Sequence, residues 1–282
     1  MAAQDSKTGT LFIVATPIGN LSDITQRAIS VLTEVDVIAC EDTRHTKKLL
    51  SAFSITNKTL SLHDHNERQK QDYIAELLLA GNDVALVSDA GTPLISDPGF
   101  HLVRHCRQLG LKVSPIPGAC AAIAALSVAG LPTDRFTFEG FLPSKSTARK
   151  KVFESIQNES RTVVFYDAPR RAIDTVSDIV EVLGPERHIV IARELTKAFE
   201  TIHGDSAGNF LAWLQQDANQ LKGEMVLIIE GLVKQENQLS ESAISLLKLL
   251  LNELPPKKAC AIVAQQYQLN KKTLYEYALS CK

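Results

Sequence analysis

The hydrophobic and polar positions of the first 118 or so residues follow two alternating periods. Short apolar runs predict strands over residues 10–15, 35–40, 59–62, 84–88 and 111–116. Helical spacing of apolar residues predicts helices that start after Ser22 and then cover 43–53, 67–80 and 99–109. Ser22 is the expected N-cap of the first helix, and Gly81 and Gly110 are expected to close the last two. This alternation predicts a mostly parallel sheet with helices on both faces.

A second β-α alternation begins after a helix of small residues expected over 119–126, which ends near residues 130–132. We interpret that helix as the crossing between two domains. Strands are then expected over 136–141, 161–166, 188–192 and 225–230, with helices over 144–157, 171–183 and 209–216. The fold class is therefore α/β, with two α/β/α domains over 1–131 and 132–234.

The end of the chain differs, because residues 235–282 are expected to be helical throughout. Helices are predicted over 243–254, 257–267 and 271–280, with a break at Pro255-Pro256. Two short helices around a tight turn are typical of a helix-turn-helix. Residues 240–282 hold six lysines against three acids, so this small tail is basic.

Composition limits the classes of protein that fit. With 45% hydrophobic and 22% charged residues, the chain is globular, and its net charge of −2 excludes a wholly basic nucleic-acid clamp. The five cysteines include no C-x-x-C pair, so neither a disulfide framework nor a zinc cluster is expected, and a reducing compartment is favoured. No secretory h-region and no apolar run long enough to span a bilayer occur, so we expect a cytoplasmic protein without a membrane partner.

Three loops rich in glycine and proline follow predicted strands, at residues 16–20, 88–99 and 115–119. Glycine lets the backbone approach a ligand closely, and proline stiffens a loop. Taken alone, each loop fits an ordinary turn between a strand and a helix as well as it fits a ligand-binding loop. Three of them at the carboxyl ends of parallel strands favour a ligand cleft, in which Asp89 and Asp97 are positioned to accept hydrogen bonds.

Several ligand classes are disfavoured by missing motifs. The chain has no G-x-x-x-x-G-K-[ST] and no G-x-G-x-x-G after its first strand, which argues against a P-loop and against the usual dinucleotide site. No cysteine and histidine set has the spacing of a metal site, and we interpret His63-Asp64-His65 as a solvated or substrate-facing strand end.

Polar clusters after other strands are candidates for catalysis. They lie at 41–46, 63–67, 193–197 and 199–201. Positive charge is concentrated in residues 144–171 and in the tail. Both regions suit contact with a phosphate backbone; the alternative for either region is a helix face that only improves solubility.

These segments resemble a known family. Eight segments are similar to ribosomal RNA small subunit methyltransferases I, of the tetrapyrrole methylase superfamily. They are TPIGNLSDIT, EDTRHT, HDHNE, SDAGTPLISDPG, PIPGACAAIAALSVAGLP, EGFLP, RELTK and GEMVLIIEG. The resemblance covers nearly the whole chain. One departure concerns residues 165–171, where FYDAPRR stands in place of the FYESPHR of many relatives. Asp167 and Arg170 therefore cannot be assigned the roles of the family's Glu and His.

The resemblance implies two α/β domains of the tetrapyrrole methylase type, in a homodimer, with S-adenosylmethionine bound between them. It implies methylation of a cytidine ribose 2′-hydroxyl in the decoding region of 16S ribosomal RNA, with the 30S subunit as the expected partner. The cofactor-binding residues carried over are Pro17, Gly19, Asn20, Asp89, Ala90, Gly91, Thr92, Pro93, Asp97, Gly99, Pro117, Gly118, Ala119 and Ala122.

The transfer needs a base for the hydroxyl, or a cation that stabilises its developing charge. We expect Lys197 and Glu200 in these roles, with Arg44 and Asp42 facing them across the cleft; whether Lys197 is base or cation stays open. The expected RNA-binding residues are Lys145, Arg149, Lys150, Lys151, Lys257, Lys258, Lys271 and Lys272. A methylase of a tetrapyrrole-like small molecule and a non-catalytic ribosome-assembly protein are the alternatives.

Overall fold

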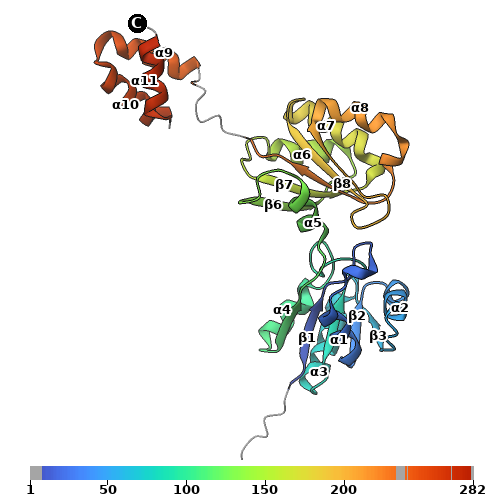
Figure 1. Ribbon diagram of the computed structural model, residues 1–282. Helices are drawn as coiled ribbons and strands as arrows, with labels where there is room; N and C mark the ends of the chain where they lie inside the picture. Colours follow the sequence, from blue (N-terminus) through green and yellow to red (C-terminus); the bar gives the residue numbers. More distant parts are fainter. Residues whose placement is uncertain (1–7, 233–238, 240, 268, 281–282) are drawn as a thin grey trace, which may run out of the picture. The chain divides into compact units, whose positions relative to one another are not determined.

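A computed structural model describes residues 8–232, 239, 241–267 and 269–280 (Figure 1). The chain divides into two compact units, Met1–Gly231 and Leu232–Lys282. The larger unit contains two five-stranded sheets. No helix in the described part of the chain is long and apolar enough to cross a membrane.

The first sheet is fully parallel, as the alternation predicts. Its strand order is β3-β2-β4-β1-β5. Successive side chains along a strand point to opposite faces of the sheet and pack in two different hydrophobic cores. Ala39 packs with helices α3 and α4 on one face, while Ile38 and Cys40 pack with α1 and α2 on the other. The elements are β1 (Thr10–Val14), α1 (Gln26–Glu34), β2 (Val37–Cys40), α2 (Thr43–Ala52), β3 (Thr59–Ser61), α3 (Glu67–Leu79), β4 (Val84–Val87), α4 (Phe100–Gln108) and β5 (Lys112–Ile116).

The start of α1 differs from the prediction. Thr25, not Ser22, is its N-cap, with the Thr25 hydroxyl accepting from the amide of Ala28 at 3.1 Å. Ser22 lies in a separate 3-10 helix, η1 (Leu21–Asp23), whose cap is the Asn20 side chain. The chain therefore turns twice after β1 before α1 begins, and local propensity did not distinguish two neighbouring hydroxyl caps.

The second sheet is mixed, with order β6-β7-β10-β8-β9. Only β6 and β7 are parallel; β10 runs antiparallel to both of its neighbours, and β8 and β9 form an antiparallel pair. The strands are β6 (Phe136–Phe141), β7 (Thr162–Asp167), β8 (His188–Arg193), β9 (Thr201–Ser206) and β10 (Met225–Ile229). The restarted alternation did not predict β9, because this edge strand is mostly polar and only partly buried.

Helices cover both faces of the second sheet. The helices α6 (Ser146–Ser155), α7 (Ala172–Leu183) and α8 (Ala207–Gln216) pack on one face around Phe153, Phe165 and Phe210 (Figure 1). The other face is covered by α5 (Ala121–Val128), the helix interpreted from sequence as the crossing. The short 3-10 helices η2 (Pro169–Arg171) and η3 (Ala218–Leu221) complete this half.

The smaller unit has three described helices around its own core. They are α9 (Glu241–Glu253), α10 (Pro256–Tyr267) and α11 (Lys271–Ser280), close to their predicted bounds. Its buried centre consists of small and branched side chains, with Leu247, Val263 and Leu274 fully buried. Short helices of this kind bury one face against each other and leave their polar faces in solvent.

Candidate functional site

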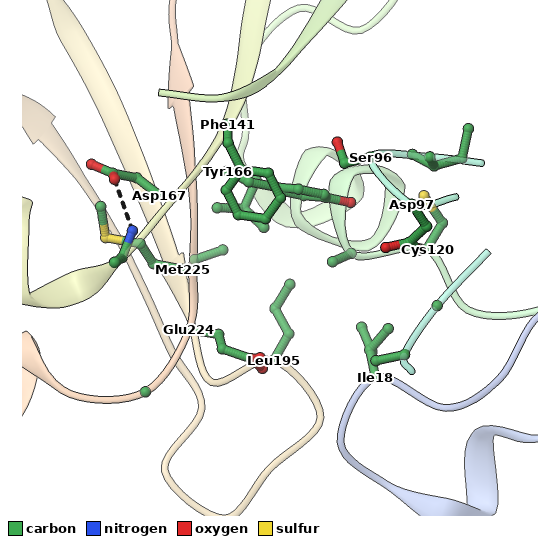
Figure 2. A pocket seen from close by; sticks show the side chains of 18 of the residues that line it. Ile18, Ser96, Asp97, Cys120, Phe141, Tyr166, Asp167, Leu195, Glu224 and Met225 are labelled. Carbon is green, nitrogen blue, oxygen red and sulfur yellow. Dashed lines mark hydrogen bonds between the residues drawn. The ribbon is translucent and has the colours of Figure 1, made fainter. Parts of the chain in front are cut away.

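A pocket of about 430 Å³ lies in the larger unit, with walls from both sheets. Asp97, Cys120 and Ile18 of the first half lie on one side in Figure 2, and Asp167, Met225 and Glu224 of the second half on the other. This volume falls in the range of small-molecule sites, about 300–1,000 Å³.

Hydrogen bonds join the three glycine- and proline-rich loops. Thr16 and Gly91 exchange backbone hydrogen bonds of 2.9 and 3.1 Å, which ties the loop after β1 to the loop after β4. The Thr92 hydroxyl donates to the carbonyl of Ala119 at 3.0 Å, which ties in the loop after β5. The three loops therefore form one continuous wall, as the sequence predicted.

Carboxylates give this wall a negative character. Asp89 and Asp97 both line the pocket, and the amide of Asp42 donates to Oδ1 of Asp89 at 3.1 Å. Burial, together with the charge of Asp89, raises the pKa of Asp97 to about 6, although its interaction with Ser88 acts in the opposite direction. A cationic ligand would relieve this crowding of negative charge.

The second sheet supplies an aromatic wall. Tyr166 at the end of β7 accepts a hydrogen bond from the amide of Ala122 at 3.2 Å, and burial raises the pKa of its hydroxyl to about 12. The rings of Phe138 and Phe141 meet the Tyr166 ring edge-on, with centroids 4.9 and 5.3 Å away. Phe141 lines the pocket while 64% of it stays exposed.

Residues 167–171 place one fixed and one free arginine at the pocket. Asp167 is buried and accepts from the amide of Ala168 at 2.8 Å, from Nε of Arg171 at 2.8 Å and from the Thr175 hydroxyl at 2.7 Å. Asp167 thus acts as a structural anchor for Arg171. Arg170 also lines the pocket, is exposed, and has no hydrogen bond or ion pair with any residue that the structure describes.

The loop after β8 carries an ion-pair network. Nζ of Lys197 lies 2.9 Å from Oε1 of Glu194 and 2.8 Å from Oε2 of Glu224. Burial lowers the pKa of Lys197, but the two carboxylates more than compensate and the net shift is upward. Lys197 is therefore a protonated ammonium. Glu200 is exposed, and its Oε2 accepts from the amide of Thr196 at 2.7 Å, which fixes a turn where Thr196 has a φ of 66°.

The predicted residues fall into two groups with respect to the pocket. Those that line it are Asp89, Ala90, Gly91, Thr92 and Asp97. The others are next to lining residues or shape the loops: Pro17, Gly19 and Asn20 flank Ile18; Pro117, Gly118, Ala119 and Ala122 flank Cys120 and Ala121; Pro93 and Gly99 belong to the loop after β4.

Asp42 and Arg44 are not brought to the pocket wall. They pair with each other, with Nη2 of Arg44 at 2.9 Å from Oδ2 of Asp42, and the Arg44 side chain is 88% exposed. Hydrogen bonds from the Arg44 side chain and amide lower the pKa of Asp42 to about 2. Lys197 reaches the pocket only through its partner Glu224, which lines it.

One expected RNA contact requires correction. Arg149 is buried, and its Nη2 lies 2.6 Å from Oδ2 of Asp178, so its guanidinium is unavailable to a phosphate. The helix pattern could not show that this one basic residue faces the core. Lys150 is partly buried and pairs with Glu181 at 2.6 Å. The remaining expected RNA-binding residues are exposed: Lys145, Lys151, Lys257, Lys258, Lys271 and Lys272.

Sequence reasoning did not assign the pocket residues that the second sheet supplies, among them Phe141, Tyr166 and Glu224. Glu224 is the most informative, because Met225 pairs with both Asp167 and Arg193 across antiparallel β10. The start of β10 therefore lies beside the ends of β7 and β8. A parallel arrangement would have placed Glu224 at the opposite edge, so no local signal could have found it.

Two family models match the chain. Tetrapyrrole (corrin/porphyrin) methylases match residues 10–210, and the RsmI C-terminal HTH domain matches residues 237–282. Solved structures with the same fold include diphthine synthase, with a TM-score of 0.60 at 15% identity over 79% of this chain and 90% of that one. Uroporphyrin-III-C-methyltransferase from Thermus thermophilus has a TM-score of 0.53 at 18% identity, over 79% and 94%.

Curated relatives match over nearly the whole length. Ribosomal RNA small subunit methyltransferase I of Escherichia coli O157:H7 is 56% identical over 98% of this chain and 96% of its own. The protein of the same name from Pasteurella multocida is 56% identical over 96% and 97%. The chain belongs to the tetrapyrrole (corrin/porphyrin) methylase family, in the ribosomal RNA small subunit methyltransferase I group.

Proposed function

We propose that this protein is an S-adenosylmethionine-dependent methyltransferase that methylates the ribose 2′-hydroxyl of a cytidine in the decoding region of 16S ribosomal RNA. The observation that carries the proposal is the full-length match to relatives of that name, which includes both the methylase body and the helical C-terminal unit. A homodimer acting on the 30S subunit is part of the proposal.

The chemistry of the pocket fits the methyl donor. S-adenosylmethionine supplies, when bound, a methyl group activated by a positively charged sulfur. Asp89 and Asp97 offer negative charge to this cation, and the backbone of the joined loops offers carbonyl oxygens. The residues that would hold it are Asp89, Ala90, Gly91, Thr92 and Asp97 at the wall, supported by Pro17, Gly19, Asn20, Pro93, Gly99, Pro117, Gly118, Ala119 and Ala122.

The opposite wall has features that suit a nucleotide acceptor. The exposed ring of Phe141 offers a face on which a base stacks, and the unpaired guanidinium of Arg170 suits a phosphate. RNA is recognised mainly through unstacked bases and backbone contacts. Exposed lysines would extend the contact to the RNA backbone: Lys145 at the N-cap of α6, Lys151 on α6, and four on the C-terminal unit.

The geometry favours the cationic role for Lys197 over the basic one. Its ammonium is held by two carboxylates, so it has no lone pair to accept a proton and instead supplies positive charge beside the pocket. Glu200 would act by holding the turn at Thr196 that carries Lys197. Asp42 would act through the hydrogen bond that its backbone amide donates to Asp89, while its side chain pairs with Arg44 at the surface.

The test is labelled-methyl transfer to 30S subunits that lack the modification, followed by nucleoside analysis. We expect label in a 2′-O-methylcytidine from the decoding region. Label on a base only, or transfer to a tetrapyrrole-like acceptor in place of RNA, would contradict the proposed acceptor. Failure to bind S-adenosylmethionine in calorimetry would support the non-catalytic assembly protein instead.

A further inference from the structure

Glu224 presents a carboxylate to the pocket from the start of β10 (Figure 2). Its side chain is 77% exposed, and one of its oxygens, Oε2, accepts from Nζ of Lys197 at 2.8 Å. The other oxygen, Oε1, has no hydrogen bond to any residue within the described ranges. We propose that Glu224 is the proton acceptor of the methyl transfer, with its free Oε1 facing the acceptor hydroxyl; this inference rests on the proposed function.

The backbone of Glu224 is held by Glu194, and its side chain is held by Lys197. Oε1 of Glu194 accepts both from the amide of Glu224 at 3.0 Å and from Nζ of Lys197 at 2.9 Å. Gly223 precedes it with a φ of 87°, and a Cβ at Gly223 would lie 2.2 Å from the Glu194 carboxyl group. The backbone here therefore requires glycine, and the three charged side chains are positioned before any substrate arrives.

A carboxylate is a sufficient base for this reaction. The ribose hydroxyl is too weak an acid to transfer its proton to a carboxylate in the ground state. As the hydroxyl oxygen forms its bond to the methyl carbon, the bond from that carbon to sulfur breaks and its electron pair stays on sulfur. As this bond forms, the hydroxyl proton becomes strongly acidic and passes to Oε1 of Glu224 in the same step, so little charge accumulates on the oxygen. Charge and atoms balance without any further reactant.

Apart from Asp97, the other candidates for a base near the pocket are protonated or already accept hydrogen bonds. Lys197 can only donate. Glu194 accepts two hydrogen bonds, and Asp167 accepts from Ala168, Arg171 and Thr175. Asp89 accepts the amide of Asp42, in the loops assigned to the cationic donor. Asp97 is the remaining competitor, and it lies in the same loop system as Asp89.

The decisive variant is Glu224→Gln, which keeps the shape and an oxygen for Lys197 but cannot take the proton. We expect kcat on 30S subunits to fall at least about 100-fold, as general-base loss does. The dissociation constant for S-adenosylhomocysteine should stay within about twofold, since kcat and binding report different interactions. Glu159→Gln is the matched control, because Glu159 pairs with Arg161 before the start of β7, at the opposite end of the strand from the pocket.

Chemical rescue provides a second test in case the amide introduced by Glu224→Gln disturbs the ion-pair network with Lys197 and Glu194. For Glu224→Ala, added formate should restore kcat at least about tenfold, because a small carboxylate can replace the missing base. Asp97→Asn should lose donor affinity and respond to formate not at all.

A Glu224→Gln protein with kcat within threefold of wild type would overturn the inference, and so would formate rescue of Asp97→Asn in place of Glu224→Ala. A loss that appears only as weaker donor binding would make Glu224 a donor ligand and overturn it too. A different result would contradict the proposed function itself: the absence of 2′-O-methylcytidine from 30S subunits treated with the wild-type protein.

Discussion

Lys197 lies directly over Gly19: a Cβ at Gly19 would lie 2.6 Å from Cγ of Lys197 and 2.9 Å from Oγ1 of Thr196. The loop after β1 and the loop after β8 therefore pack against each other without room for one methyl group. This contact joins the glycine-containing loop after β1 to the loop that carries the ion-pair network.

Gly19→Ala should displace the loop of Lys197, because overpacking costs about 1–3 kcal/mol in a well-packed site. We expect a lower midpoint of thermal unfolding and at least a tenfold loss of methyl transfer. The double variant Gly19→Ala/Lys197→Ala removes the clash with Cγ and should recover part of the lost stability, although not the activity. A Gly19→Ala protein with unchanged stability and activity would show that the contact is not tight.

Lys197→Ala should lower methyl transfer at least about tenfold, because it removes the ammonium that holds the Glu224 carboxylate at 2.8 Å. Donor affinity, measured by calorimetry, should change little, since Lys197 is not among the residues that line the pocket. Turnover near that of the wild type would remove Lys197 from the mechanism.

Donor binding should weaken as the pH falls from 7.5 to 5. The pKa of Asp97 is raised to about 6, so its carboxylate is charged above this pH and attracts the cationic donor, and it becomes neutral below it. The affinity for S-adenosylmethionine should fall by up to about tenfold over this interval if the charge is required. Asp97→Asn should bind weakly with a flat pH profile, and the same slope in both proteins would assign the titration to another group.

Substitutions at Arg149 and Lys151 should affect different properties, folding stability for Arg149 and RNA binding for Lys151. Arg149→Ala removes the nearest charge partner of the buried Asp178, which keeps a 2.8 Å hydrogen bond from the Ser146 hydroxyl and a 3.8 Å ion pair with Lys150. We expect the free energy of unfolding to fall by about 3 kcal/mol in urea denaturation. Lys151→Ala should change stability by less than about 0.5 kcal/mol, because its side chain is exposed. It should instead reduce the salt dependence of RNA affinity. Equal stability of the two variants would contradict the structural role of Arg149.

The lysines of the C-terminal unit should act through substrate affinity. Replacing Lys257, Lys258, Lys271 and Lys272 with glutamine should weaken 30S binding and lower the slope of log K against log salt by about 0.7 for each phosphate that the protein no longer neutralises. Donor binding should be unaffected, because the residues proposed to bind the donor belong to the larger unit. If removal of residues 240–282 leaves RNA affinity and activity intact, the unit is only structural.

The sequence by itself determined the parallel first sheet, the three joined loops and the helical C-terminal unit. In each case the signal is local: a β-branched run, a glycine after a helix, or a loop at the end of a strand whose neighbours run in the same direction. The resemblance of the motifs, from SDAGTPLISDPG to RELTK, determined the family for the same reason, since each motif is a continuous stretch of chain.

Only the tertiary structure decided the second wall of the pocket. The antiparallel direction of β10 places Glu224 beside the ends of β7 and β8, and this direction depends on pairing with strands about 30 and 60 residues earlier. The burial of Arg149 likewise depends on Asp178 in the next helix. Spacing along a chain fixes which residues share one element, but which elements meet is set by the packing of hydrophobic faces and by the partners that buried charges require.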